Sequence, residues 1–183
     1  MKKLILSMVL IGATSLAFGQ KKVLKEAEKG FKSGDLQTAQ NAINAACMNP
    51  ETGGDPATHL LKAQIETKIF GSDSSNTMET VQLGVAALES FNKAFEMAGN
   101  NKAAGVGKDI YEDDLPGVPA NLRPYSIFTL KNVAFDKGIE RYSDDDFEMA
   151  YEFFNMAGEI DLADTTIHYN AGFLANDLGK YED

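Results

Sequence analysis

Small and apolar residues recur at intervals of three and four along most of this chain, and no segment alternates apolar and polar residues as a β-strand does. This spacing places the apolar side chains on one face of a helix. The two clearest stripes are Leu36, Ala39, Ile43 and Ala46, followed by Ala87, Phe91 and Ala94. Residues 56–70 read as a further helix, with Leu60 and Ala63 facing inward. The pattern predicts an all-α fold.

The last third of the chain repeats itself at a fixed interval. Gly138 and Gly172 are separated by the same number of residues as Phe147 and Tyr181. Self-similarity at a fixed period is the sequence signature of a repeat architecture, in which each repeat is one supersecondary unit. We therefore expect two consecutive copies of one structural unit here, and we call the distance from Gly138 to Gly172 the repeat interval.

The first of these copies has the composition of two closely packed helices. Gly138, Ala150 and Ala157 are small enough to let the helices approach each other, and Phe154 fills the space between them. Three consecutive aspartates at residues 144–146 separate the two helices, and aspartate is a favoured cap for the start of a helix.

These residues resemble the tetratricopeptide repeat family, whose unit is a helix-turn-helix of about 34 residues. With Lys131 at repeat position one, Gly138, Ala150, Phe154 and Ala157 fall at the family's packing positions. The resemblance implies helix-turn-helix repeats stacked as an α-solenoid over residues 20–183. The implied units cover about 20–53, 56–101, 131–164 and, in truncated form, 165–183, so we expect an N-terminal fragment of a longer array.

Two segments depart from this pattern and are predicted to be long loop insertions. The first covers about 71–82, where a run of Gly, Ser, Asp and Asn delays the second helix of its unit by about twelve residues. The second covers about 99–123 and is rich in Gly, Asn, Asp and Pro, the residues that favour turns and loops.

Residues 1–19 are predicted to be a signal peptide. Lys2 and Lys3 precede an apolar run from residue 4 to residue 18, and small residues at Ala17 and Gly19 favour cleavage before Gln20. The apolar run is shorter than the ~20 residues needed to cross a bilayer. We therefore expect an exported protein of the Gram-negative envelope type, located in the periplasm or associated with the cell envelope, without membrane insertion after cleavage.

The charge and the single cysteine narrow the possible partners. The net charge is −10, and removal of Lys2 and Lys3 takes it to −12. Nucleic acid is not an expected partner, because phosphate binding needs clustered Lys and Arg. Cys47 is the only cysteine, so no internal disulfide forms. Whether its thiol is a buried small hydrophobe or a reactive group stays open.

We find no pattern of residues typical of catalysis, and we predict no enzyme activity, no cofactor and no metal. The only histidines, His59 and His168, lack further donors at ligand spacing. The acidic loop fails the EF-hand pattern because Met149 stands where the glycine is required. The segment Gly105–Lys108 lacks the spacing and the hydroxyl residue of a phosphate-binding loop.

The resemblance implies a non-catalytic protein–protein interaction scaffold that binds another protein or a peptide through its concave face. In the last two units, the family's groove positions hold mainly aromatic and amide side chains, which suit capture of a peptide. The candidate partner-binding residues are Asn132, Phe135, Ile139 and Tyr142 in one unit and Tyr169, Phe173 and Asn176 in the next. Two alternatives stay open: an N-terminal repeat arm of a larger exported enzyme, or a small-ligand carrier with the segment 99–123 as its lid.

Overall fold

The computed structural model describes residues 22–112 and 125–180, and within these ranges the chain forms helices and no strands. The predicted signal peptide lies outside the described residues. The first described helix covers residues 22–33. It is followed by α2 (Leu36–Met48), α3 (Pro56–Ser72), α4 (Met78–Met97), α5 (Gly105–Tyr111), α6 (Ile127–Ser143), α7 (Phe147–Ile160) and α8 (Thr165–Leu178). The predicted all-α fold is confirmed.

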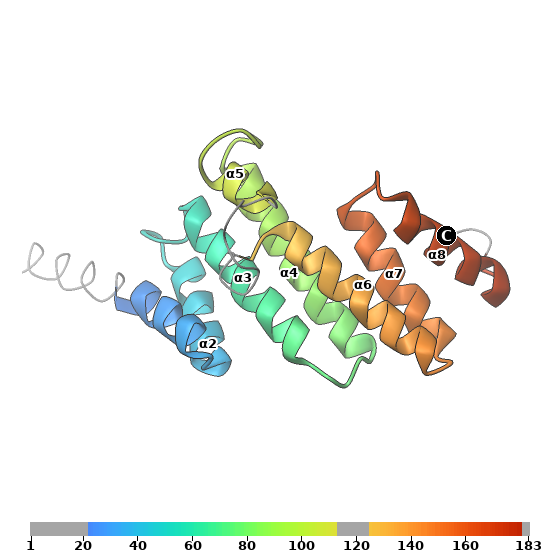
Figure 1. Ribbon diagram of the computed structural model, residues 1–183. Coiled ribbons are helices and arrows are strands. Elements are labelled where there is room, and N and C mark those ends of the chain that lie inside the picture. Colours follow the sequence, from blue (N-terminus) through green and yellow to red (C-terminus); the bar gives the residue numbers. More distant parts are fainter. Residues whose placement is uncertain (1–21, 113–124, 181–183) are drawn as a thin grey trace, which may run out of the picture.

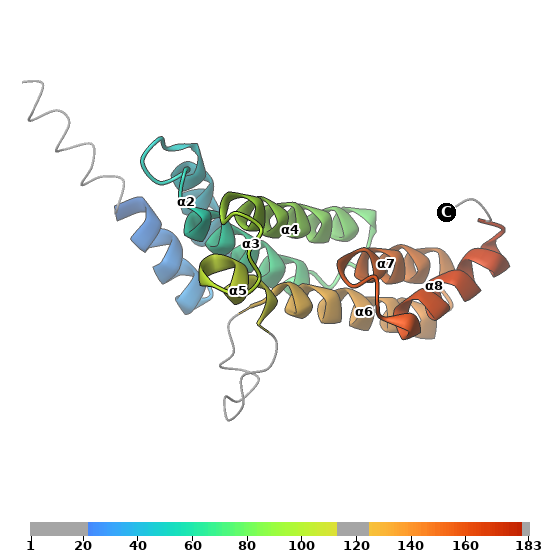
Figure 2. The same cartoon turned by 90° about the horizontal axis from the view of Figure 1, so that it is seen from above.

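Helices that follow one another in the chain also pack against one another. The helix 22–33 shares a buried cluster with α2, α3 packs on α4, and α6 packs on α7. The helix α8 packs on α7, so the helices other than α5 lie side by side in chain order, and α5 lies at one end of α4 (Figure 1). The helix 22–33 with α2, α3 with α4, and α6 with α7 thus form three helix pairs. Figure 2 shows that the second helix of each pair lies on the same side of the first.

The turns within the three helix pairs share one backbone feature. Gly34, Asn76 and Asp145 have φ angles of +81°, +48° and +61°, and each lies two residues before the next helix begins. This left-handed conformation is open to glycine and is tolerated by asparagine and aspartate. Gly179, at +72°, ends α8 in the same way and follows Asp145 at the repeat interval defined by Gly138 and Gly172.

Aspartate side chains cap four of the described helices. Asp35, Asp55, Asp146 and Asp164 each accept a hydrogen bond from a backbone N–H in the first turn of α2, α3, α7 and α8, at distances between 2.9 and 3.3 Å. These bonds satisfy N–H groups that have no partner within the helix. The capping predicted for the aspartates at residues 144–146 is confirmed at Asp146.

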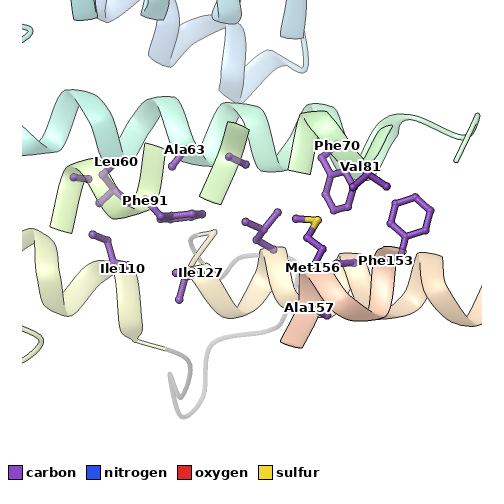
Figure 3. Close-up of a cluster of buried hydrophobic side chains, with 14 of the residues drawn as sticks. Leu60, Ala63, Phe70, Val81, Phe91, Ile110, Ile127, Phe153, Met156 and Ala157 are labelled. Carbon is purple, nitrogen blue, oxygen red and sulfur yellow. The ribbon is translucent and has the colours of Figure 1, made fainter. Parts of the chain in front are cut away.

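The larger buried cluster joins α3, α4, α5, α6 and α7, and it also includes Ile167 of α8. Figure 3 shows Phe70 of α3, Val81 of α4 and Met156 of α7 close together at one end of this cluster. The rings of Phe70 and Phe153 lie 6.3 Å apart. The stripes predicted from the sequence are buried here and in a second cluster around α2, except that Leu36 is only half-buried. Their fully or almost fully buried members are Ala39, Ile43, Ala46, Ala87, Phe91 and Ala94.

The prediction of a long loop at 71–82 is wrong. Only residues 73–77 lie between α3 and α4, because the additional residues lengthen these helices to 17 and 20 residues. The added turns are stabilised by burial: Phe70 and Val81 belong to the larger cluster, and Gly84 lies against the Met156 side chain.

The prediction of a loop at 99–123 is wrong for the part that forms α5, and residues 113–124 lie outside the described residues. Ile110 of α5 is fully buried, and the Tyr111 ring packs edge-on against Phe95 at 5.1 Å. Gly107 lies so close to the Asn101 carbonyl oxygen that a Cβ atom would come within 2.0 Å of it. Gly107, one of the glycines that suggested a loop, therefore permits a close packing contact.

A buried lysine fastens α6 to the turn between α3 and α4. The Lys137 side chain is 7% exposed and donates hydrogen bonds to the Asp73 backbone carbonyl at 2.5 Å and to Asn76 Oδ1 at 2.7 Å. The Asn76 amide in turn donates to Glu140 Oε2 at 2.8 Å. Burial lowers the pKa of Lys137, against the opposing effect of the nearby carboxylates Asp73 and Glu140.

We expect Gly138→Ala and Gly172→Ala to change stability in opposite directions. A Cβ atom at Gly138 would come within 2.6 Å of the Phe154 ring, whereas at Gly172 it would meet nothing within 4 Å. Overpacking costs about 1–3 kcal/mol, which exceeds the roughly 1 kcal/mol that alanine gains over glycine in a helix. Denaturant unfolding should show Gly138→Ala destabilised and Gly172→Ala stabilised. Equal shifts would contradict the assigned α6–α7 contact.

We also expect Lys137→Met to destabilise the fold by about 1–3 kcal/mol, because the Asp73 carbonyl and the Asn76 amide oxygen lose their shared donor. Lys93→Met is the matched control, since its 3.8 Å ion pair with Glu96 is exposed and its loss should cost less than about 1 kcal/mol. Denaturant midpoints of the two variants give the comparison. If both variants unfold at the same midpoint, the Lys137 network does not hold α6 in place.

Candidate functional site

A hollow of about 260 Å³ lies between α6 and α8, with α7 beneath it. Its lining residues are Ile139 and Tyr142 of α6, Phe154 of α7, and Tyr169, Asn170, Phe173 and Leu174 of α8. Four of these seven residues, Ile139, Tyr142, Tyr169 and Phe173, were predicted from the sequence. The structure therefore brings together candidate residues from two different predicted units.

The walls of this hollow are exposed, although they are largely apolar. Tyr169 is 73% exposed, Phe173 48%, and Ile139 and Tyr142 44% each. With Phe147, whose ring centroid lies 5.4 Å from that of Tyr142, they make up five of the eight exposed large hydrophobic side chains in the described part of the chain. Scattered single apolar residues on a surface are ordinary, but a contiguous patch of them marks an interaction site.

Local helix geometry sets the walls and the floor. Ile139 and Tyr142 are three residues apart on α6, and Tyr169 and Phe173 are four apart on α8. The two side chains of each pair therefore project from the same face of their helix. The floor is the Phe154 ring, which is 2% exposed and lies directly against the α6 backbone at Gly138. Because a side chain at Gly138 would push α6 and α7 apart, this glycine helps to set the depth of the hollow.

A second hollow of about 300 Å³ continues along the same two helices. It is lined by Lys131, Asn132 and Phe135 of α6, by Asp164, and by Thr166 and Ile167 of α8. We call the two hollows together the α6–α8 furrow. Two further candidates, Asn132 and Phe135, lie here, but Phe135 is half-buried and its ring packs 5.4 Å from Phe154. Asn176 is exposed on α8 and lines neither hollow.

The positive charge in the second hollow is neutralised. Lys131 Nζ donates to Asp161 Oδ2 at 2.9 Å and to Asp164 Oδ2 at 3.3 Å, which joins α6 to the turn between α7 and α8. The hydrogen bond from Lys131 lowers the pKa of the Asp161 carboxyl group. Lys131 therefore holds the furrow together and is not an open anion-binding group.

The furrow provides contact area and few groups that could do chemistry. Its first hollow holds two phenol groups and one amide, and at about 260 Å³ it is smaller than the roughly 300–1,000 Å³ of typical small-molecule sites. Within the described residues, no group of three or more His, Cys, Asp or Glu could hold a metal ion. Cys47 lies half-buried on α2, and burial raises the pKa of its thiol, which disfavours the nucleophilic thiolate.

Sequence reasoning missed Asn170 and Leu174 as lining residues, and it assigned Phe154 to packing alone. Asn170 follows Tyr169 directly and lies three residues before Phe173, so helical spacing from the two aromatic residues could have identified it. Leu174 and Phe154 are both buried core residues, and the part of the core that they form lines the hollow.

Away from the furrow, Tyr125 lies against the helix 22–33 and α3. Its ring meets the edge of the Phe31 ring at 5.7 Å, and its backbone carbonyl accepts a hydrogen bond from Gln64 Nε2 at 3.2 Å. Lys68 Nζ donates to the Phe31 carbonyl at 3.2 Å and lies 5.1 Å from the Phe31 ring centroid. These contacts involve no residue predicted as a site.

Comparison with known proteins adds no further information. Of the helices within residues 22–112 and 125–180, none combines the length and apolar character needed to cross a membrane. No protein-family model matches this chain, and no curated protein is significantly similar to it.

Proposed function

We propose that this chain is a non-catalytic interaction scaffold of the tetratricopeptide type, which binds another protein or a peptide in the α6–α8 furrow. The observation that carries the proposal is the gathering of Ile139, Tyr142, Tyr169 and Phe173 along one exposed furrow. Tyrosine is among the residues that dominate binding energy at interfaces. An open furrow between helices, with aromatic and aliphatic walls in its first hollow, suits an extended peptide or a partner helix.

The repeat architecture is supported by the recurring geometry of the helix pairs. Each turn within a pair has a residue with left-handed φ two positions before the next helix, and Asp145 and Gly179 have this conformation one repeat interval apart. The second helix of each pair lies on the same side (Figure 2), which leaves the first helices, including α6 and α8, to line a common opposite face. In a stack of such units, that face is the natural binding surface.

We place the protein outside the cytoplasm, in the periplasm or at the cell envelope, on the basis of the leader pattern in residues 1–19. N-terminal sequencing of the protein from envelope fractions should therefore begin at Gln20, either free or cyclised. Recovery of an intact Met1 in those fractions would rule out a cleaved leader.

Site-specific photo-crosslinking in the native host tests the furrow as a binding surface. A photoreactive phenylalanine analogue in place of Phe173 should give adducts with one discrete protein species. The same analogue in place of Met48, which is 85% exposed and lies on α2, should give none of that species. Tyr142→Ala should abolish the adduct while the thermal unfolding temperature stays close to that of the parent. Identical adducts from both positions would contradict binding in the furrow.

A further inference from the structure

The α6–α8 furrow has a structural counterpart, and the chain itself occupies it. The counterpart lies between the helix 22–33 and α3, where Tyr125 packs. Phe31 and Tyr142 hold the same place relative to their turns, because the backbone carbonyl of each accepts a hydrogen bond from the left-handed residue that ends the helix. The two bonds are Gly34 N–H to Phe31 O at 3.3 Å and Asp145 N–H to Tyr142 O at 3.2 Å.

The opposite walls of the two sites correspond as well. Both α3 and α8 begin directly after an aspartate cap, so their residues can be matched by counting from the first helical position. The ninth residue is Gln64 in α3 and Phe173 in α8. The thirteenth residue is Lys68 in α3 and Asp177 in α8. The charge at this position is therefore reversed between the occupied site and the open one.

The occupied site shows how such a furrow holds an aromatic residue. Tyr125 precedes α6 and lies outside any helix, and its ring meets the Phe31 ring in an edge-to-face arrangement. A side-chain amide, that of Gln64, binds its backbone carbonyl. The α6–α8 furrow offers the same two kinds of group: the Tyr142 ring in the place of Phe31, and the Asn170 amide in the lining of the hollow.

We propose that the α6–α8 furrow binds an extended segment of another protein that carries an aromatic side chain with a basic residue beside it. This inference rests on the proposed function. The aromatic ring packs against Tyr142 and Phe173, as Tyr125 packs against Phe31. The basic residue follows from Asp177, which is exposed and makes no ion pair within the described residues. Asp177 lies just outside the two hollows, but it follows Phe173 by four residues on α8, so it lies on the same face of that helix as Phe173. The chain's net charge of −10 also favours a cationic partner.

Three short blocked peptides test this chemistry on the full mature chain. The first has arginine two residues before tyrosine in an alanine background, the second replaces the tyrosine by alanine, and the third replaces the arginine by glutamate. In chemical-shift titrations, the first peptide should shift the amides of Tyr142, Tyr169 and Phe173. We expect about tenfold weaker binding without the tyrosine. With glutamate in place of the arginine, binding should weaken by roughly two- to fivefold, and less so at high salt.

Reversing the charge on the protein provides the sharper test. Asp177→Lys should make the glutamate peptide bind more tightly than the arginine peptide. Tyr142→Ala should weaken all tyrosine peptides, and Leu162→Ala, at an 80% exposed position outside the furrow, should change nothing. An unchanged preference in Asp177→Lys, or shifts centred on Phe31, would overturn the proposed partner chemistry. A chain that dimerises through the furrow without peptide would also overturn it, because a second copy would then be the occupant.

The outcomes separate this inference from the proposed function. If Phe173 gives its specific cross-link while the three peptides bind equally, the furrow is a binding surface and the partner chemistry is wrong. If neither the cross-link nor peptide binding is found, both proposals are wrong.

Discussion

The contact between Gly138 and Phe154 is the constraint on which the furrow depends. The Phe154 ring lies where a side chain at position 138 would be, so α6 and α7 approach to backbone contact. The same ring forms the floor of the first hollow and belongs to the cluster that includes Ala171 and Leu174 of α8. One aromatic side chain thus fixes the distance between two helices and supports the third, because packed interiors leave few voids to absorb a shift.

Polar contacts decide how the third helix pair sits on the second. A buried apolar surface alone tolerates sliding, since the hydrophobic effect is not directional. The Lys137 ammonium has two defined acceptors in the turn between α3 and α4, and Glu140 holds the Asn76 amide of that turn. A network of this kind is costly unless every member is bonded, and it therefore favours one arrangement over its neighbours. Lys131 performs a similar task at the turn between α7 and α8.

The sequence predicted most of the described helices but not α5, and it predicted one aspartate cap, in the run at residues 144–146, because these features depend on spacing within one segment. The four predicted residues of the first hollow came from the groove positions that the resemblance implies. The sequence did not predict the lengths of α3 and α4, since the added turns are stabilised by contact with α7, which is distant in sequence. From the sequence alone Gly107 suggests a loop, because its close contact with the Asn101 carbonyl depends on the folded structure. Lys137 lies on a helix whose other lysine and arginine are more exposed, and nothing in its local sequence indicates that Asn76 lies within reach.

The two walls of the furrow belong to helices that meet mainly through a third. Both α6 and α8 pack extensively on α7, and they share little direct contact with each other. The width of the furrow therefore depends on how α6 and α8 are each packed on α7. A ligand seated between the walls would oppose any change in the angle between α6 and α8, and by reciprocity a change in that angle would alter how tightly the ligand is held.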